Sequence, residues 1–269
     1  MRRRILSLAG VSLTLLILTA VLGFLWMEEA EAINFAEKNL APCPEHIFGT
    51  DWMGRDMFKR TVAGLSMSIR LGVLTASVSS VIALVMAAAA SLFGTAVDRL
   101  VSGLTDLVMG IPHILLLILI SCAAGKGFWG VTVGISVTHW PSLARLLRAE
   151  MMRIRESPYV KISEKLGMSP LKIAREHMII QVFPQFVTGL VLMFPHAILH
   201  EASITFLGFG LSPEKPAVGV ILSESMSYLI TGKWWLAFFP GAALVVCVLL
   251  FQGLGQGINR LLDPAGAHE

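Results

Sequence analysis

The sequence predicts an all-α membrane protein with six transmembrane helices. Hydrophobic residues make up 55% of the 269-residue chain and charged residues only 14%, whereas a soluble domain carries about a quarter charged residues. The apolar residues come in six long blocks, each long enough to cross a hydrocarbon core of about 30 Å. Basic residues concentrate between particular blocks. These observations predict a single transmembrane domain over residues 1–269.

The first expected span follows three arginines, Arg2–Arg4, which should hold the N-terminus in the cytoplasm. A cleaved signal peptide is the alternative, because Ala30-Glu31-Ala32 resembles a cleavage site. Signal peptides usually have an apolar region of about 7–15 residues, and this block is longer, so we expect it to remain as a helix. The six expected spans lie near residues 5–26, 70–93, 102–123, 128–147, 185–210 and 235–257.

The charges between the spans predict which loops face the cytoplasm. The first loop, residues 27–69, opens with four glutamates and should lie outside, whereas residues 145–177 hold eight basic against four acidic side chains. The net charge of +3, from 21 basic and 18 acidic residues, is too small to suggest nucleic acid as a partner. The eight basic residues are Arg145, Arg148, Arg153, Arg155, Lys161, Lys165, Lys172 and Arg175.

The long inner loop, residues 156–178, has the pattern of a helical hairpin. Ser157-Pro158 and Ser169-Pro170 each place a serine at an N-cap and a proline in the first helical turn. Gly167 between them can take the left-handed conformation that ends a helix. We expect helices near 158–166 and 170–178, which would either dock on another protein or lie on anionic lipid headgroups.

Motifs for catalysis are missing from the sequence. His200-Glu201 begins like H-E-x-x-H, but the second histidine is absent, and neither G-x-S-x-G nor a phosphate-binding loop occurs. Cys43, Cys122 and Cys247 are too far apart for a zinc or redox motif. We therefore expect no enzyme and no bound cofactor, with an intramembrane enzyme and a passive channel as the competing classes.

Histidines inside the expected spans are the main candidates for a solute path. His113, His139 and His196 should lie near mid-depth, and His200 and Glu201 about one turn closer to the outside. Polar groups at this depth usually face the bundle interior or a water-filled path. His196 and His200 share a helix face and could be transient ligands for Ni²⁺ or Zn²⁺, since a path must release its solute. Packing of neutral histidines between helices is the alternative.

The outer segment Thr50–Gly64 mixes apolar and charged residues just before the second span. It could form an amphipathic helix with Trp52 at the headgroup level, or it could contact an extracytoplasmic protein. Asp51, Arg55 and Asp56 could instead pair with one another and shape a turn.

Several motifs together resemble those of ATP-binding-cassette importer permeases of the peptide/nickel subfamily. The stretch His46–Asp56 resembles the subfamily's G-T-D-x-x-G-R-D signature, and residues 156–177 resemble the loop that seats on the ATPase subunit. The resemblance runs from about residue 45 to residue 264. The signature residues are Gly49, Thr50, Asp51, Gly54, Arg55 and Asp56; further matches are Asp106, Pro112, Gly167, His177, the run ending at Gly210, and Leu262-Asp263-Pro264.

The resemblance implies a multi-pass permease in a bacterial or archaeal cytoplasmic (inner) membrane. Its partners would be a second homologous permease, two ATP-binding subunits that use the ATP, and an extracytoplasmic solute-binding protein. This chain departs from the family with Lys161-Ile162-Ser163 in place of Glu-Ala-Ala, and with Gln256 in place of aspartate. The implied ATPase-coupling residues are Lys161, Ser163, Glu164, Gly167, Ser169, Pro170 and His177.

Three features resemble the nickel permeases more than the dipeptide or oligopeptide permeases. They are His139-Trp140, the His196 and His200 pair, and the six-residue gap between His177 and Pro184. The resemblance therefore implies a path for nickel or a related transition metal, free or chelated. Import of dipeptides or oligopeptides is the alternative.

Overall fold

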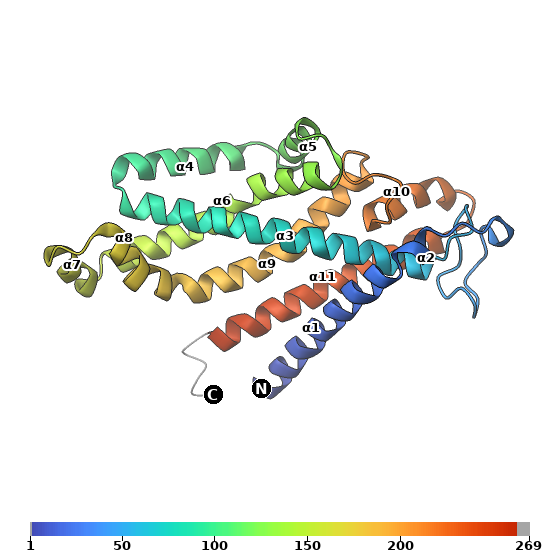
Figure 1. Cartoon of the computed structure of the whole chain (residues 1–269), viewed down its shortest axis with the longest axis horizontal. Helices are drawn as coiled ribbons and strands as arrows, with labels where there is room; N and C mark the ends of the chain where they lie inside the picture. The colour runs from blue at the N-terminus through green and yellow to red at the C-terminus, as the bar shows by residue number, and fades with distance from the viewer. Residues whose placement is uncertain (1, 263–269) are drawn as a thin grey trace.

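The computed structural model describes residues 2–262 and consists of helices that run mostly along one long axis (Figure 1). Within these residues there is no strand, only an isolated bridge between Thr50 and Asp56, so the all-α prediction is confirmed. Asp263-Pro264 of the closing motif lies outside the described residues. The elements are α1 (Arg2–Leu25), α2 (Met27–Glu31), η1 (Phe35–Glu37), α3 (Met57–Leu92), α4 (Thr95–Gly110), α5 (His113–Ala123), α6 (Gly127–Arg155), α7 (Pro158–Lys165), α8 (Pro170–Ile173), η2 (Ala174–Met178), α9 (Ile179–Phe206), α10 (Val218–Leu229) and α11 (Trp235–Leu262).

Four helical stretches in the described part of the chain are long and apolar enough to cross a membrane. They are Ser7–Leu25, Met57–Leu92, Pro170–Phe206 and Trp235–Leu262. The helix pair α4 and α5 makes a fifth if the two count as one broken span. Helix α6 has 29 residues but carries arginines along its second half, and it is not among the four. The sixth span therefore stays a prediction.

The expected span near 102–123 is not one continuous helix in the structure. Helices α4 and α5 meet at an angle of 98° across Ile111 and Pro112. Proline has no backbone N–H and disfavours helical geometry in the preceding residue. Accordingly, Ile111 is extended, with φ −88° and ψ 137°. The break starts α5 at His113 and so aims this histidine into the bundle.

Helix α3 is the longest, with 36 residues, and it begins 13 residues before the expected span at residue 70. Asp56 caps it, since the Asp56 carboxylate accepts hydrogen bonds from the backbone N–H groups of Phe58 and Lys59, both at 2.9 Å. Small buried residues on α3, such as Ala76 and Ala83, let α6 pack closely. The hydroxyl of Ser79 donates across this contact to the carbonyl of Ser136 at 2.8 Å.

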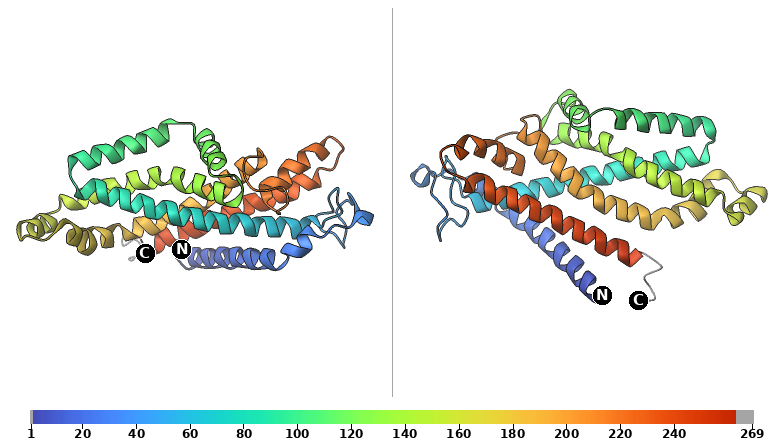
Figure 2. Two further views of the ribbon diagram at one scale, coloured as in Figure 1. Left: turned by 45° about the horizontal axis from the view of Figure 1, so that its top comes forward. Right: turned by 180° about the vertical axis from the view of Figure 1, so that it is seen from behind.

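The two ends of the molecule differ in character. Helices α7 and α8 form a hairpin at one end, whereas α2, α10 and the loop 32–56 lie at the other (Figure 1). Helices α1 and α11 run side by side in opposite directions along one flank, and the bent pair α4 and α5 lies on the opposite flank (Figure 2). Long helices thus connect the hairpin end to the loop end.

Candidate functional site

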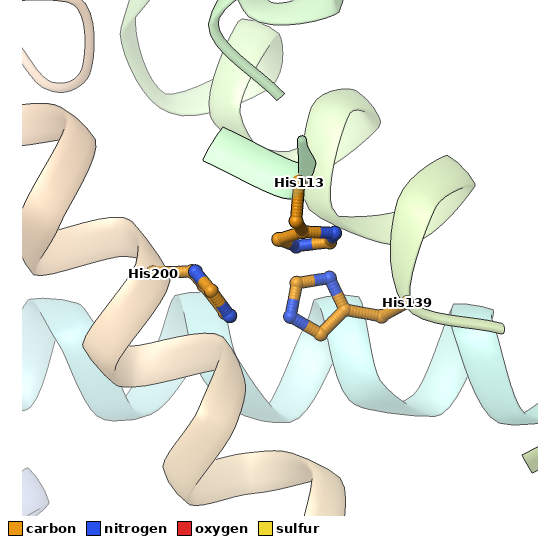
Figure 3. Close-up of side chains that lie close together, drawn as sticks. All are labelled: His113, His139 and His200. Atoms are coloured by element: carbon orange, nitrogen blue, oxygen red, sulfur yellow. The ribbon is translucent and has the colours of Figure 1, made fainter. Parts of the chain in front are cut away.

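Three histidines from three different helices meet at the break between α4 and α5 (Figure 3). His113 begins α5, His139 lies in α6, and His200 lies in α9. Their ring centroids are 4.7 Å apart for His113 and His139, 4.4 Å for His113 and His200, and 4.9 Å for His139 and His200. All three side chains are half-buried, and we refer to them as the histidine trio.

A cavity of about 570 Å³ opens beside the histidine trio. No Asp, Glu, Lys or Arg lies in its lining, so the trio and His196 provide its ionisable groups. The lining also contains two methionines and two residues with hydroxyl groups. The lining residues are Val108, Met109, Gly110, Ile111, Pro112, His113, Thr138, His139, Pro141, Ser142, Met193, His196 and His200.

The hydrogen bonds of His139 define its tautomer. Its Nδ1 lies 3.1 Å from the carbonyl oxygen of Ile135, and a carbonyl can only accept, so Nδ1 carries the proton. The Nε2 atom of His139 therefore has a free lone pair. The Nε2 atoms of His139 and His113 are both buried without a hydrogen-bond partner among the described residues. Unsatisfied buried polar atoms are costly, so these two nitrogens are available to a group that enters the cavity.

His196 and Glu201 lie differently from what the sequence led us to expect. His196 lines the same cavity as His200 and is exposed, but it is not one of the three histidines whose ligand atoms converge, so the pair of His196 and His200 stays a prediction. Glu201 is fully buried and is not part of the cavity lining. Its carboxylate accepts hydrogen bonds from the hydroxyls of Ser68 at 2.6 Å and Thr205 at 3.0 Å. This carboxylate ties α9 to α3, and it pairs with neither His200 nor Arg70.

The hairpin turn at Gly167 ends α7 in the way expected from the sequence. Gly167 has φ +82°, and its N–H donates to the carbonyl of Glu164 at 3.0 Å while the N–H of Met168 donates to that of Ser163 at 3.1 Å. These two bonds are the Schellman arrangement with glycine in the left-handed conformation. Pro158 begins α7 and Pro170 begins α8.

Other local details of the hairpin differ from the expectation. Ser157 and Ser169 occupy N-cap positions, but neither side chain makes a capping hydrogen bond. The second helix covers 170–178 as expected, but it changes from the four-residue α8 to the π-helix η2 and then continues into α9 without a break. The structure therefore has a wide helical turn between the hairpin and the cavity-lining helix. Such turns are common at functional sites.

One polar contact joins the two arms of the hairpin, and others link α7 to the end of α6. The Ser163 hydroxyl donates to the Tyr159 carbonyl at 3.0 Å, so the Nε2–H of His177 donates to the Ser163 oxygen at 3.2 Å. The hydrogen bond from Lys161, at 2.6 Å, lowers the pKa of the Glu156 carboxyl. Glu164 lies 3.6 Å from Arg155. The coupling residues expected from the resemblance therefore lie on or beside one compact hairpin.

The hairpin exposes large apolar side chains at its tip. Ile162 is 58% exposed, Leu166 82% and Leu171 68%. Val160 and Ile173 face the other way and are buried in the core. A small element with a buried apolar face and a second, exposed apolar face fits a docking surface better than a solvated loop.

The signature segment at the opposite end forms a buried turn. The Oδ1 atom of Asp51 accepts hydrogen bonds from the N–H groups of Met53 at 2.8 Å and Arg55 at 3.0 Å, and its Oδ2 accepts from the Arg55 Nε at 2.6 Å. Gly54 has φ +77°, and a Cβ there would lie 1.7 Å from the carbonyl oxygen of Asn34. This geometry matches the expectation that the charged residues pair and shape a turn. The helix considered for residues 50–64 forms only from Met57 onward, as the start of α3, and residues 50–56 form the turn instead.

Two residues that no sequence pattern singled out, Arg60 and Glu224, complete this ionic cluster. Arg60 donates to Asp51 at 3.0 Å and lies 2.8 Å from Glu224 of α10, which also lies 3.3 Å from Arg55. Sequence patterns could not reveal Glu224, since it is 164 positions after Arg60. The cluster joins the loop 32–56 to α3 and α10.

Long apolar helices, a cavity at a broken helix and an exposed docking hairpin are together typical of a membrane permease that works with a partner protein. The family described as "Binding-protein-dependent transport system inner membrane component" matches residues 79–265, and the chain belongs to this family. It is a transport component of ATP-binding-cassette importers, so the class expected from the sequence is confirmed.

Individual relatives and a solved structure agree with this assignment. The chain is 30% identical to the dipeptide transport system permease protein DppC of Bacillus subtilis (strain 168), over 98% of this chain and 83% of that protein. It is 32% identical to a putative peptide transport system permease protein of Brucella suis, over 98% of this chain and 89% of that protein. The MetNI methionine ABC transporter in an inward-facing conformation shares the fold, with a TM-score of 0.65 and 19% identity, over 77% of this chain and 98% of that chain.

These relatives do not support the preference for a nickel-type permease. Both are named as peptide or dipeptide permeases, which favours the alternative solute over nickel. The spacing of His139, His196 and His200 was therefore too weak a signal to separate the subtypes.

Proposed function

We propose that this chain is a permease subunit of an ATP-driven peptide importer. The observation that carries the proposal is similarity along nearly the whole chain to dipeptide and peptide permeases. In this proposal a second, homologous permease completes the path, two partner ATPases supply the energy, and an extracytoplasmic binding protein delivers the solute. The chain would cross the inner membrane six times, with α4 and α5 as one broken span, α6 as another, and the N-terminus in the cytoplasm.

The connections of the hairpin support a mechanism for coupling. Helix α6 ends at Arg155, three residues before α7, and α8 continues through η2 into α9. Helix α6 carries His139 and helix α9 carries His200, so each of these helices forms one wall of the cavity. A push by closing ATPases on the exposed side chains of α7 and α8 would move both walls together. Opening the cavity to alternate sides in this way couples ATP hydrolysis to a change in solute affinity.

The first test is uptake of a radiolabelled dipeptide by proteoliposomes that contain the complete transporter. We expect accumulation that requires ATP inside, binding protein outside and this chain in the complex. A complex assembled with ATPases that cannot hydrolyse ATP is the matched control. Accumulation of Ni²⁺ without any dipeptide uptake would contradict the peptide assignment and identify the metal ion as the solute.

A transition metal is the second candidate solute, because three imidazoles converge on the cavity. Peptides can themselves chelate such metals through amine, amide and imidazole donors. A peptide and a transition-metal ion could therefore use the same cavity. Whether the histidine trio binds a metal distinguishes a metal-free peptide from a metal-bound solute.

A further inference from the structure

We propose that His113, His139 and His200 form a binding site for a divalent transition-metal ion of the nickel, cobalt, copper and zinc class. Each of the three residues comes from a different helix, and each offers one ring nitrogen. Neutral imidazole is a good ligand for these ions. The role of the site in transport rests on the proposed function, whereas metal binding by the trio can be measured without it.

The distances between the rings allow a common metal ion. The ligand atoms all lie within 4.8 Å of one another. Three atoms so placed lie within about 2.8 Å of a common centre, while metal–imidazole bonds measure about 2.0–2.1 Å. Each nitrogen must therefore move inward by roughly 0.7 Å, which small rotations of half-buried side chains can provide. The site is open and nearly assembled.

The hydrogen bonding of His139 supports the assignment independently of distance. Metal-binding histidines usually donate their second ring N–H to a backbone carbonyl or a carboxylate, which orients the ring and selects the tautomer. The Nδ1–H of His139 donates in this way to Ile135, and its Nε2 is free. The unpartnered Nε2 of His113 is a second free donor atom. A metal ion would satisfy both buried nitrogens.

The composition of the cavity determines which ions fit. Ca²⁺ and Mg²⁺ need several oxygen ligands, and no carboxylate lines the cavity. Three neutral ligands leave the charge of the ion uncompensated and at least one coordination position open. An anionic donor, such as the carboxylate of a peptide, would occupy that position from the 570 Å³ cavity. The trio therefore takes the cation either free or already bound to a small chelator.

Binding of ⁶³Ni²⁺ to the purified complete transporter tests the site. The complex carries no polyhistidine tag, and equilibrium dialysis is run in excess Mg²⁺. We expect one high-affinity Ni²⁺ per copy of this chain. Substitutions His113→Ala, His139→Ala and His200→Ala should each weaken binding by about tenfold or more, whereas His196→Ala should weaken it by less than about threefold. Equal losses in His196→Ala and His200→Ala, or no Ni²⁺ bound above the level of the triple variant, would overturn the proposal.

X-ray absorption of Ni²⁺ bound to the wild-type complex tests the site without depending on the assembly of any variant. We expect the scattering pattern of about three imidazole ligands. A first shell of oxygen atoms alone would identify an adventitious ion and overturn the proposal.

Adding one equivalent of Gly-His dipeptide distinguishes the two sources of the cation. Weaker Ni²⁺ binding would identify the free ion as the ligand, and dipeptide retained together with Ni²⁺ would identify a chelate. Dipeptide uptake driven by ATP without any Ni²⁺ binding would remove this inference and leave the proposed importer. Binding of Ni²⁺ without uptake of any solute would do the opposite.

Discussion

Single side chains join segments that lie far apart in the sequence. The Asp51 carboxylate is 3% exposed and holds its own turn, Arg55 and Arg60 at once. Glu201 is wholly buried and joins α9 to Ser68 of α3, 133 positions earlier. Buried charges and carboxyls are stable only with complete hydrogen bonding. A few buried polar contacts therefore hold together segments that lie far apart in the sequence.

Replacing Asp51 with alanine should destabilise the protein strongly. The change leaves two buried arginines facing Glu224 alone and frees two backbone N–H groups, at a cost of about 3–5 kcal/mol. Asp51→Asn should cost less, because its amide oxygen can still accept from the backbone. The thermal unfolding midpoint of the detergent-solubilised complex measures this, with Glu214→Ala at an exposed site as the control. Equal midpoints for Asp51→Ala and the control would contradict the importance of the cluster.

The hairpin of α7 and α8 is the element whose shape depends most on one residue. Gly167 has φ +82°, and a Cβ there would meet no atom within 4 Å. The restriction at this position is therefore one of backbone conformation and not of space. Left-handed geometry costs an ordinary residue about 1–2 kcal/mol, and a β-branched residue more.

Gly167→Val should uncouple ATP hydrolysis from transport. Valine is β-branched, so the penalty exceeds that of an ordinary residue; a cost above about 1 kcal/mol lowers the population of the docking conformation by more than about fivefold, and solute uptake should fall by a similar factor. Gly103→Val is the matched control, because Gly103 also has open space around its Cβ position but lies in the ordinary helical conformation of α4. Uptake by Gly167→Val equal to that of the control, at the same membrane level, would exclude the hairpin as the coupling element.

At the scale of the whole molecule, the hairpin and the loop 32–56 lie at opposite ends (Figure 1). The apolar stretches of α1, α3, α9 and α11 lie between these two ends. The basic residues of 145–177 are close to the hairpin, as the positive-inside pattern requires of a cytoplasmic end. The loop 32–56 should then face the outside.

Cysteine labelling can test this orientation. In a chain whose three native cysteines are replaced, we expect Glu45→Cys to react with a membrane-impermeant maleimide in intact spheroplasts. Leu166→Cys should react only after permeabilisation, and co-expressed ATPase subunits should protect it if they cover the hairpin tip. Restoring only the buried Cys247 supplies the unreactive control. The reverse labelling pattern would invert the topology.

Local sequence patterns were enough to predict most of the helices and the turn of the hairpin. Apolar blocks, Ser-Pro pairs and Gly167 predicted helices and a capped hairpin, because hydropathy, proline geometry and left-handed glycine act over a few neighbouring residues. The start of α3 was missed, because the cap at Asp56 precedes the apolar block by several turns of mixed composition. The histidines were selected as polar groups in spans, with only His196 and His200 paired by their four-residue spacing.

Only the tertiary structure decided which of these groups meet. The 98° break at Pro112 starts α5 at His113, which meets His139 and His200, whereas His196 is not part of the trio. Glu201 was expected on the solute path but bonds to Ser68, and Arg60 and Glu224 became visible only as a pair across the fold. The sequence alone establishes helices and their polarity, because these depend on nearest neighbours along the chain. The cavity and its three converging imidazoles depend on how helices cross, which is set by packing between residues distant in sequence.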